Sequence, residues 1–435
     1  MIGVLVTALT VVAFEAPAPS LLVLPTCETP EPVALARVWS DATGVDPGYR
    51  AATEMVEAWE ARRSAVRREW SPQLSMEGLE NWGQRLSPSE ERALGVGFRG
   101  ELRLLGTWTF LDGERRHRAS EADLFRAEAE AAGRAFDVEF RGELARLYVE
   151  AAAAEALFEA RIEQRDGLRE LADPVERRLA AGVDARWEGH LLDESLARAE
   201  RLLAAAEQDR ARGRAVLSAL LGRCVRPTTI HPGSEGNTGA PDLTDNPELL
   251  RLQRLAEAGD ATADVERNLD RFQIGLTGGA GPVRSRAFVD DSYRMEYLLG
   301  FTARWSPDLF GTRGGRAAAE EALARSVRAQ AESQRMALTR ELHGLAAELE
   351  RSEDRADRLE EEVVRAETAR QASLARWREG VGHWTDVIDA HERLHEARQE
   401  KVVLDLQVAL ALIRYGEAEG RLDAVPGRLG QESLP

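Results

Sequence analysis

Cysteine and aromatic residues are scarce in this chain of 435 residues. Cys27 and Cys224 are the only cysteines, so the sequence predicts no disulfide framework and no zinc cluster. Aromatic residues make up 6% of the sequence and charged residues 30%, which is little material for the cores of two or three globular domains. Both observations favour extended helices over several compact domains.

Positive charge is in short supply relative to negative charge. With 75 acidic and 57 basic residues, the formal net charge is -18. Phosphate binding needs clustered cationic surface that outweighs the acids. We therefore predict no nucleic-acid partner, and we interpret the arginines, which are interleaved with Glu, as solvated helix faces.

Only one long apolar run is present, at the start of the chain. Residues 2–14 are too few to span a bilayer as a helix, and the small residues 16–20 offer a cleavage site. We interpret residues 1–20 as a signal peptide for export, although no Lys or Arg precedes the run. After cleavage, Cys27 is either a lipid attachment site or a free thiol. Residues 24–26 match a lipobox poorly, which favours the thiol.

Recognisable catalytic motifs are missing as well. No Gly-rich phosphate loop lies between a strand and a helix, and no nucleophile with a base and an orienting acid stands out. The sequence therefore predicts no enzyme and no cofactor. His391 and His395 have the helical spacing of a metal pair, with Asp389 nearby. Solvent-facing helix positions are the interpretation we favour for them, so we predict no metal site.

An internal repeat is the most informative feature that the chain does contain. Residues 178–183 separate two helical stretches, and residues 376–381 do the same in the second half. Asp46-Pro47 and Asn246-Pro247 precede the two units. Each unit reads as a short helix, two strands, a long helix, a sharp turn and another long helix. We predict a signal peptide at 1–20, an N-terminal extension at 21–45, a first repeat at 46–223, a linker at 224–245, a second repeat at 246–422 and a poorly ordered tail at 423–435.

The helical stretches carry a coiled-coil pattern, with apolar residues three and four apart. The pattern includes Leu144, Leu147, Ala151, Ala154 and Phe158 in the first unit and Leu342, Leu345 and Leu349 in the second. Helices over 113–179 and 315–379 would each be about 100 Å long. Short turns predict antiparallel partners at 184–221 and 385–420. By itself this pattern suits a soluble structural coiled coil.

Alternating segments change that interpretation. Over 291–305, Tyr293, Met295, Tyr297, Leu299 and Phe301 fall on one face, while charged residues fall on the other. Further strands are expected at 70–82, 95–108 and 272–281. An aromatic face opposite an ionic one is typical of a membrane β-barrel wall, although a half-buried soluble sheet has the same period. Four strands cannot close a barrel, so the membrane interpretation requires several chains.

The sequence resembles the TolC-like outer membrane efflux proteins of Gram-negative bacteria, over about residues 46–422. The resemblance rests on the duplicated plan and on four motifs: residues 70–75, 110–113, 308–311, and 376–381 followed by Asp-Val-Ile-Asp-Ala at 386–390. It implies a mainly α-helical homotrimer with a twelve-stranded barrel in outer membrane lipid and a periplasmic α-helical coiled-coil tunnel. Such a protein would be a passive exit duct, serving an inner-membrane pump and a periplasmic adaptor protein in tripartite efflux or type I secretion.

The resemblance also assigns residues at the periplasmic entrance. Asp386 and Asp389 match carboxylates that ring the closed mouth and select cations; an exposed Asp near a helix start is also a favourable partner of the helix dipole. Trp377 and Glu188 match gate contacts. Gly382 stands where some members have Arg, so either the closing bridge is missing or a neighbour such as Arg186 replaces that Arg.

The two sharp turns are the expected adaptor-binding tips. They comprise Arg178, Leu179, Gly182 and Val183 in one hairpin and Arg376, Gly380 and Val381 in the other, together with Trp377. Gly permits the tight reversal, and Arg suits the end of the incoming helix. Two alternatives have no barrel: a periplasmic coiled-coil adaptor or structural scaffold, and a secreted filament-like protein.

Overall fold

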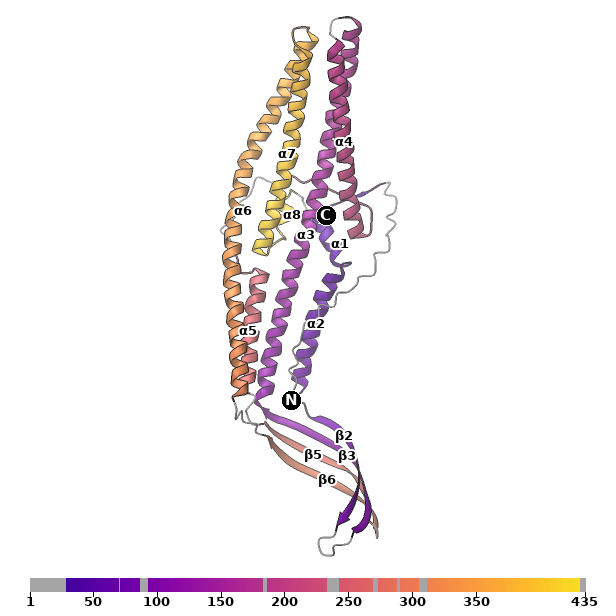
Figure 1. Cartoon of the computed structure of the whole chain (residues 1–435), viewed down its shortest axis with the longest axis vertical. Helices are drawn as coiled ribbons and strands as arrows, with labels where there is room; N and C mark the ends of the chain where they lie inside the picture. The colour runs from indigo at the N-terminus through magenta and orange to yellow at the C-terminus, as the bar shows by residue number, and fades with distance from the viewer. Residues whose placement is uncertain are drawn as a thin grey trace.

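The computed structural model describes residues 29–69, 71–86, 93–182, 186–232, 242–268, 273–287, 290–304 and 311–430. The molecule is elongated, with helices stacked above a four-stranded sheet (Figure 1). The motif segments at 70 and 305–310, the turn residues 183–185 and the first 28 residues lie outside the described part of the chain.

The same order of elements occurs in each half. The first half contains α2 (Pro47–Arg68), β2 (Gln73–Leu86), β3 (Ala93–Asp112), α3 (Gly113–Ala180) and α4 (Arg186–Leu221). The second contains α5 (Pro247–Asn268), β5 (Gln273–Ala287), β6 (Asp290–Arg304), α6 (Thr312–Arg378) and α7 (Trp384–Glu419). The predicted duplicated helix, strand, strand, helix, helix plan is confirmed.

The two Pro-containing landmarks start the short helix of each half. Asp46 Oδ1 accepts a hydrogen bond from Tyr49 N at 2.9 Å, and Asn246 Oδ1 accepts one from Leu249 N at 3.0 Å. Each side chain thereby satisfies a donor that the helix leaves unpaired. The buried Asn246 also donates from Nδ2 to the carbonyl of Ala418 at 2.9 Å, which joins the last turn of α7 to the first turn of α5.

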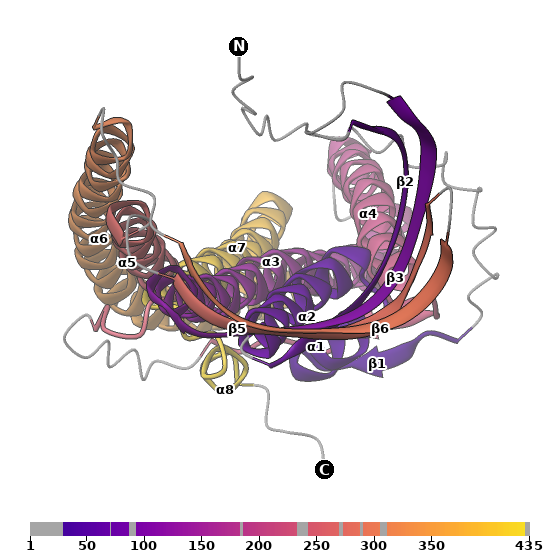
Figure 2. The same ribbon diagram turned by 90° about the horizontal axis from the view of Figure 1, so that it is seen from below.

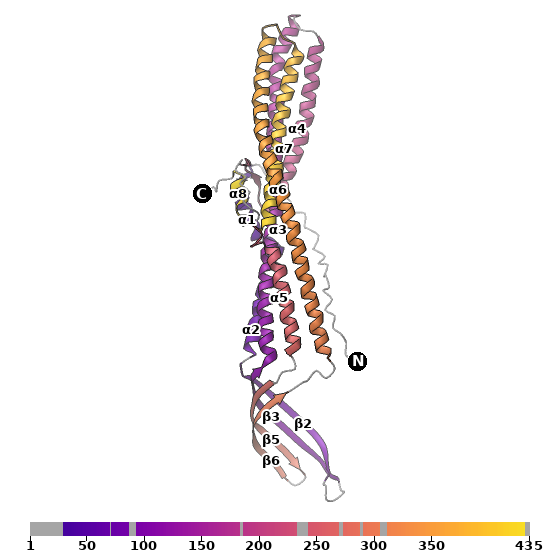
Figure 3. The same ribbon diagram turned by 90° about the vertical axis from the view of Figure 1, so that its left-hand side faces the viewer.

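The helix α3 has 68 residues and α6 has 67, so each is about 100 Å long. Beside α3 run α2 in the lower half and α4 in the upper half, and beside α6 run α5 and then α7 (Figures 1 and 3). The predicted apolar stripe is at the contacts: Leu342 is fully buried, and Leu144, Leu345 and Leu349 are nearly so. None of the described helices is long and apolar enough to cross a membrane.

A small cluster covers the middle of the helices. β1 (Glu31–Val33) pairs in parallel with β4 (Val225–Pro227), next to α1 (Leu35–Thr43) and α8 (Val425–Arg428). The Tyr148 hydroxyl donates to the carbonyl of Val33 at 2.9 Å, which fixes β1 on α3. Figure 3 shows α1 and α8 on the same side of the long helices.

Two sequence expectations fail in this cluster. The tail after residue 422 was expected to be poorly ordered, but Val425 and Leu429 are buried, because α8 packs against the end of α7. Cys224, for which no disulfide was expected, is disulfide-bonded. It lies directly before β4, a three-residue strand whose long-range parallel pairing has no clear sequence signal.

The sheet has the order β2-β3-β5-β6 with antiparallel pairing throughout. It forms a curved wall at one end of the helices (Figure 2). The strands β2 and β6 form its two edges within the described chain. The sheet therefore joins the two halves through the β3–β5 pairing and leaves open edges on both sides.

Candidate functional site

One face of the sheet is apolar and exposed. The register aligns Met76, Leu104, Ala280 and Tyr297 in one row across the four strands. On β6 alone, Met295, Tyr297, Leu299 and Phe301 have 57–79% of their surface exposed. An apolar patch of this extent on a soluble chain marks a surface that is covered by lipid or protein.

The opposite face carries an ion pair that crosses a strand. Arg103 on β3 lies 3.0 Å from Glu296 on β6, with β5 between them. Gly281 of β5 permits this close packing, because a Cβ there would lie 1.9 Å from the carbonyl oxygen of Leu102. The predicted alternation of an aromatic face with an ionic face is therefore present, and both faces of β6 are exposed over residues 294–299 and 301–304.

The far end of the molecule is formed by two helical hairpin tips. Gly182 and Gly380 have φ of 69° and 78°, in the left-handed region where glycine is favoured. Val381 N donates to Arg376 O, and Gly380 N donates to Trp377 O, each at 3.0 Å. This pair of bonds ends α6 as a Schellman motif. The predicted tight reversals are confirmed at both glycines.

The described tip residues differ in their exposure. Val381 is 77% exposed, and Arg376 and Gly380 are also exposed, so these three can be reached by a partner. Leu179 is half-buried against the core of the tip. Val183 lies outside the described residues. In the first tip, Gly182 is exposed as well.

Below the tips, two tryptophans form the centre of a core shared by both hairpins. Trp377 and Trp384 are buried, with ring centroids 4.9 Å apart. Leu168, Leu171, Val175 and Leu192 from the first hairpin pack in the same cluster. Trp377 therefore contributes to the packing of one hairpin on the other.

Arg178 links the two hairpins at this level. Its guanidinium carbon lies 4.7 Å from the centroid of the Trp377 ring, and Nη1 donates to the Trp377 carbonyl at 3.0 Å. A cation over an indole face and a charged donor to a carbonyl are both stabilising. Sequence reasoning assigned Arg178 only to the tip, because nothing local in the sequence indicates that it reaches the other hairpin.

The expected entrance carboxylates point away from this core. Asp386 and Asp389 are exposed, whereas Val387, Ile388 and Ala390 between and beside them are buried. Their spacing of three residues puts both on one face of α7. Glu188 lies half-buried in the first turn of α4, and nothing is described of the Arg186 side chain.

The two histidines on α7 are buried, contrary to expectation. His391 and His395 are 1% and 3% exposed, with ring centroids 4.3 Å apart. His391 Nε2 lies 3.0 Å from the carbonyl oxygen of Gln164 and therefore carries the proton that it donates. Helical spacing could not reveal this burial, because α3 covers this face of α7 from more than two hundred residues away in sequence.

A charged layer on three helices surrounds this histidine pair. Arg398 of α7 pairs with Glu163 of α3 at 2.7 Å and with Glu367 of α6 at 3.5 Å, and Arg370 pairs with Glu367 at 2.9 Å. Burial lowers the pKa of His395 to about 3, and His391, Arg398 and Arg370 act in the same direction. Burial also lowers the pKa of His391. Both rings are therefore neutral at physiological pH.

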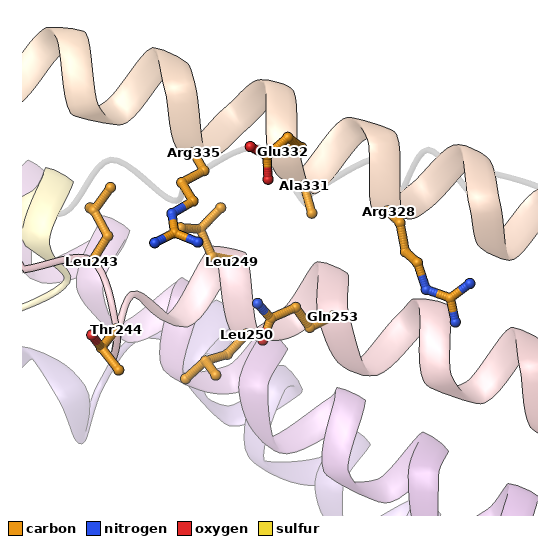
Figure 4. Close-up of a pocket in the computed structure, with 9 residues that line it drawn as sticks. All are labelled: Leu243, Thr244, Leu249, Leu250, Gln253, Arg328, Ala331, Glu332 and Arg335. Atoms are coloured by element: carbon orange, nitrogen blue, oxygen red, sulfur yellow. The ribbon is translucent and has the colours of Figure 1, made fainter.

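Other concave surfaces offer less defined chemistry. A cavity of about 520 Å³ lies where the start of α5 faces α6, as Figure 4 shows. It is lined by Leu243, Thr244, Leu249, Leu250, Gln253, Arg328, Ala331, Glu332 and Arg335. Arg328 in its wall pairs with Asp260. In the described part of the chain, no group of three or more His, Cys, Asp and Glu side chains could hold a metal ion.

Comparison with known proteins agrees with this geometry. Residues 243–420 match the family model for outer membrane efflux protein. The matched range begins just before α5 and contains β5, β6, α6 and α7, including the second hairpin tip. Among curated proteins, none matches the chain.

Solved structures extend the likeness to almost the whole chain. The outer membrane protein VceC from Vibrio cholerae has a TM-score of 0.70 at 18% identity, covering 89% of this chain and 96% of VceC. The CmeC outer membrane channel of Campylobacter jejuni has a TM-score of 0.72 at 12% identity, covering 92% and 87%. The open state of the MtrE outer membrane channel of Neisseria gonorrhoeae has a TM-score of 0.70 at 17% identity, covering 92% and 91%.

These likenesses confirm the predicted fold class and the resemblance on which it was based. By sequence, the second repeat of this chain is thus similar to the outer membrane efflux protein family, and the chain shares the fold of the solved outer membrane channels.

Proposed function

We propose that the protein is the outer membrane exit channel of an export system, assembled as a homotrimer with a large periplasmic portion. The observation that carries the proposal is the sheet: four strands, an exposed apolar face, a charged opposite face and two open edges. Hydrocarbon accepts no unpaired backbone groups, so both edges must pair with further strands. Three copies provide twelve strands, a number compatible with a closed barrel.

The helices then form the walls of a periplasmic duct. The channel moves substrate passively, and an inner-membrane pump with a periplasmic adaptor protein delivers that substrate. The exposed second tip, with Arg376, Gly380 and Val381, is the proposed adaptor contact, together with Gly182 and its neighbours. Tripartite efflux and type I secretion both need such a duct, and the sheet and tips serve either.

We assign the entrance constriction to Asp386 and Asp389. Their exposure next to a buried helix face supports the assignment, since an exposed pair in each of three chains would surround one axis. Carboxylates so close together favour cations and would bind divalent ions. Their position in the first turns of α7 also suits the helix dipole, which stabilises the same arrangement.

We assign closure of the entrance to Trp377 and Glu188, the gate contacts that the resemblance implies, and we add Arg178 to them. The Arg178 contact spans the two hairpins. Arg178 thereby supplies the positive charge that some family members carry as an Arg at the position of Gly382. The Trp377 ring, buried against Trp384, holds that cation on an apolar core. Separation of the hairpins would have to break this contact.

Fractionation and reconstitution test the proposal. The protein should be recovered from outer membranes as a detergent-resistant trimer, and the purified trimer should conduct ions in a planar bilayer. Recovery from the periplasmic extract as a soluble monomer would instead favour the coiled-coil adaptor or scaffold. A membrane-bound trimer without conductance would contradict the duct but retain the membrane assignment.

A further inference from the structure

We propose that neighbouring copies of this chain join as its two halves do, so that β6 of one copy pairs with β2 of the next in the register in which β3 pairs with β5. This register places Arg304 opposite Glu77 of the partner subunit. The inference rests on the proposed homotrimer and adds the contacts that hold its copies together. Its basis is the duplication, in which each of these elements of the first half has a counterpart in the second.

The strand pairings align the two halves of the sheet residue by residue. β2 begins at Gln73, which lies opposite Thr107 of β3. β5 begins at Gln273, which lies opposite Arg304, the last residue of β6. Thr107 and Arg304 are therefore counterparts, because each is paired with the first residue of the preceding strand.

The pairing that joins the two halves then predicts the pairing between copies. Thr107 of β3 lies opposite Thr277 of β5. Thr277 is the fifth residue of β5, as Glu77 is of β2. Replacing each residue by its counterpart places Arg304 opposite Glu77 of the partner subunit. The strands alternate in direction across the sheet, so β2 of the next copy is antiparallel to β6, as β5 is.

Charge supports this register. Glu77 lies opposite Arg103 of its own chain, on the charged face of the sheet, and both Glu77 and Arg304 are exposed. The proposed pairing places Glu77 between Arg103 and Arg304 of the partner subunit, and opposite charges that face each other across strands are favourable. A slip of two residues, which keeps the same face, would put Arg304 opposite Ser75 or Leu79 of the partner subunit, and neither is charged.

The helices at the same two edges of the chain are open in the same way. α5 packs between α3 and α6 and buries Leu252, Ala256 and Ala258, whereas its counterpart α2 packs on α3 and buries none of its residues. Trp384 at the start of α7 is fully buried, whereas Trp187 at the start of α4 is 52% exposed. In the proposed assembly, α6 of one copy covers α2 and α4 of the next, as α3 covers α5 and α7 within the chain.

Cysteine cross-linking in outer membranes tests the register. Directly opposite residues of an antiparallel pair have Cβ atoms about 5 Å apart, and residues displaced by two are about 7 Å apart, which is too far for a disulfide. Glu77 and Arg304 lie on opposite edges of one chain, so a bond between these positions joins two copies. Glu77→Cys with Arg304→Cys should therefore give linked dimers and trimers on oxidation with iodine, about tenfold faster or more than Ser75→Cys with Arg304→Cys. The parent is the control for its native cysteines.

A second pair keeps the test decisive if the first variant does not assemble. Gly78→Cys with Ala303→Cys tests the neighbouring position of the same register, and a Cβ at Gly78 would lie 3.9 Å from its nearest neighbour, Leu102. This variant should cross-link as well. Faster linkage of the displaced pair, linkage by Glu77→Cys alone, or a trimer in which neither predicted pair links would overturn the register and leave the membrane assignment intact. A soluble monomer without cross-links would refute the proposed function itself.

Discussion

Acid should loosen the contact between α7 and α3 at the buried histidine pair. The folded-state pKa of His395 is about 3, against an ordinary value of 6.5. When local opening exposes the ring, the open form binds more protons than the closed form at every pH between these two pKa values. The stability contribution is therefore complete above pH 6.5 and is lost as the pH falls toward 3.

The magnitude follows from the difference in proton uptake. From about pH 7.5 to about pH 5, the open form gains almost one proton per His395 and the closed form almost none, which amounts to about 2 kcal/mol. The opening equilibrium of α7 should thus rise roughly 30-fold. The lowered pKa of His391 adds to the loss in the same direction.

Hydrogen–deuterium exchange, corrected for intrinsic rates, measures this opening for α7 peptides of the trimer. In His395→Leu, the acid-induced decrease in the free energy of opening of α7 should be smaller by about 2 kcal/mol, because the titrating group is gone. His343→Leu, at an exposed position on α6, is the matched control and should respond like the parent. An equal acid response in parent and His395→Leu would refute the reasoning.

Three further substitutions test the proposed entrance and tips. Replacing Asp386 and Asp389 by Ala should reduce cation preference and weaken block by divalent ions in bilayer recordings, because it removes the local field of the carboxylates; unchanged selectivity would place the constriction elsewhere. Gly380→Val should cost about 1 kcal/mol or more at a φ of 78° and leave an inserted trimer that no longer supports export, unlike Gly344→Val within α6; normal export would make the turn a mere connection. Arg178→Ala should raise the closed-channel conductance relative to Arg177→Ala, and equal conductance would contradict the proposed closure.

The long elements were predictable because their signals are local. Proline-poor apolar repeats gave helices over 113–179 and 315–379, and the observed helices α3 and α6 differ from these ranges by at most three residues at either end. Alternation gave the outward face of β6, and glycine gave both reversals. Each of these features depends on residues that are neighbours along the chain.

Features that depend on distant partners were not predictable in this way. His391 and His395 occupy ordinary helix positions, and only the proximity of Gln164 on α3 makes them interior residues. The cation on Trp377 comes from Arg178 in the other hairpin, although the family pattern directed attention to Gly382 and Arg186. The three-residue β1–β4 ladder joins segments that flank the first repeat on either side, and it positions Cys224.

Asn246 gives the protein a mechanical connection between its two ends. One side chain bonds the last turn of α7 through Ala418 and the first turn of α5 through Leu249. A turning motion of α7 at the entrance would therefore pull directly on α5, which leads into β5 in the middle of the sheet. If the proposed duct opens by such a motion, torque at one end would reach the sheet at the other end, so a stiff barrel would resist opening and the proposed adaptor would have to supply that work.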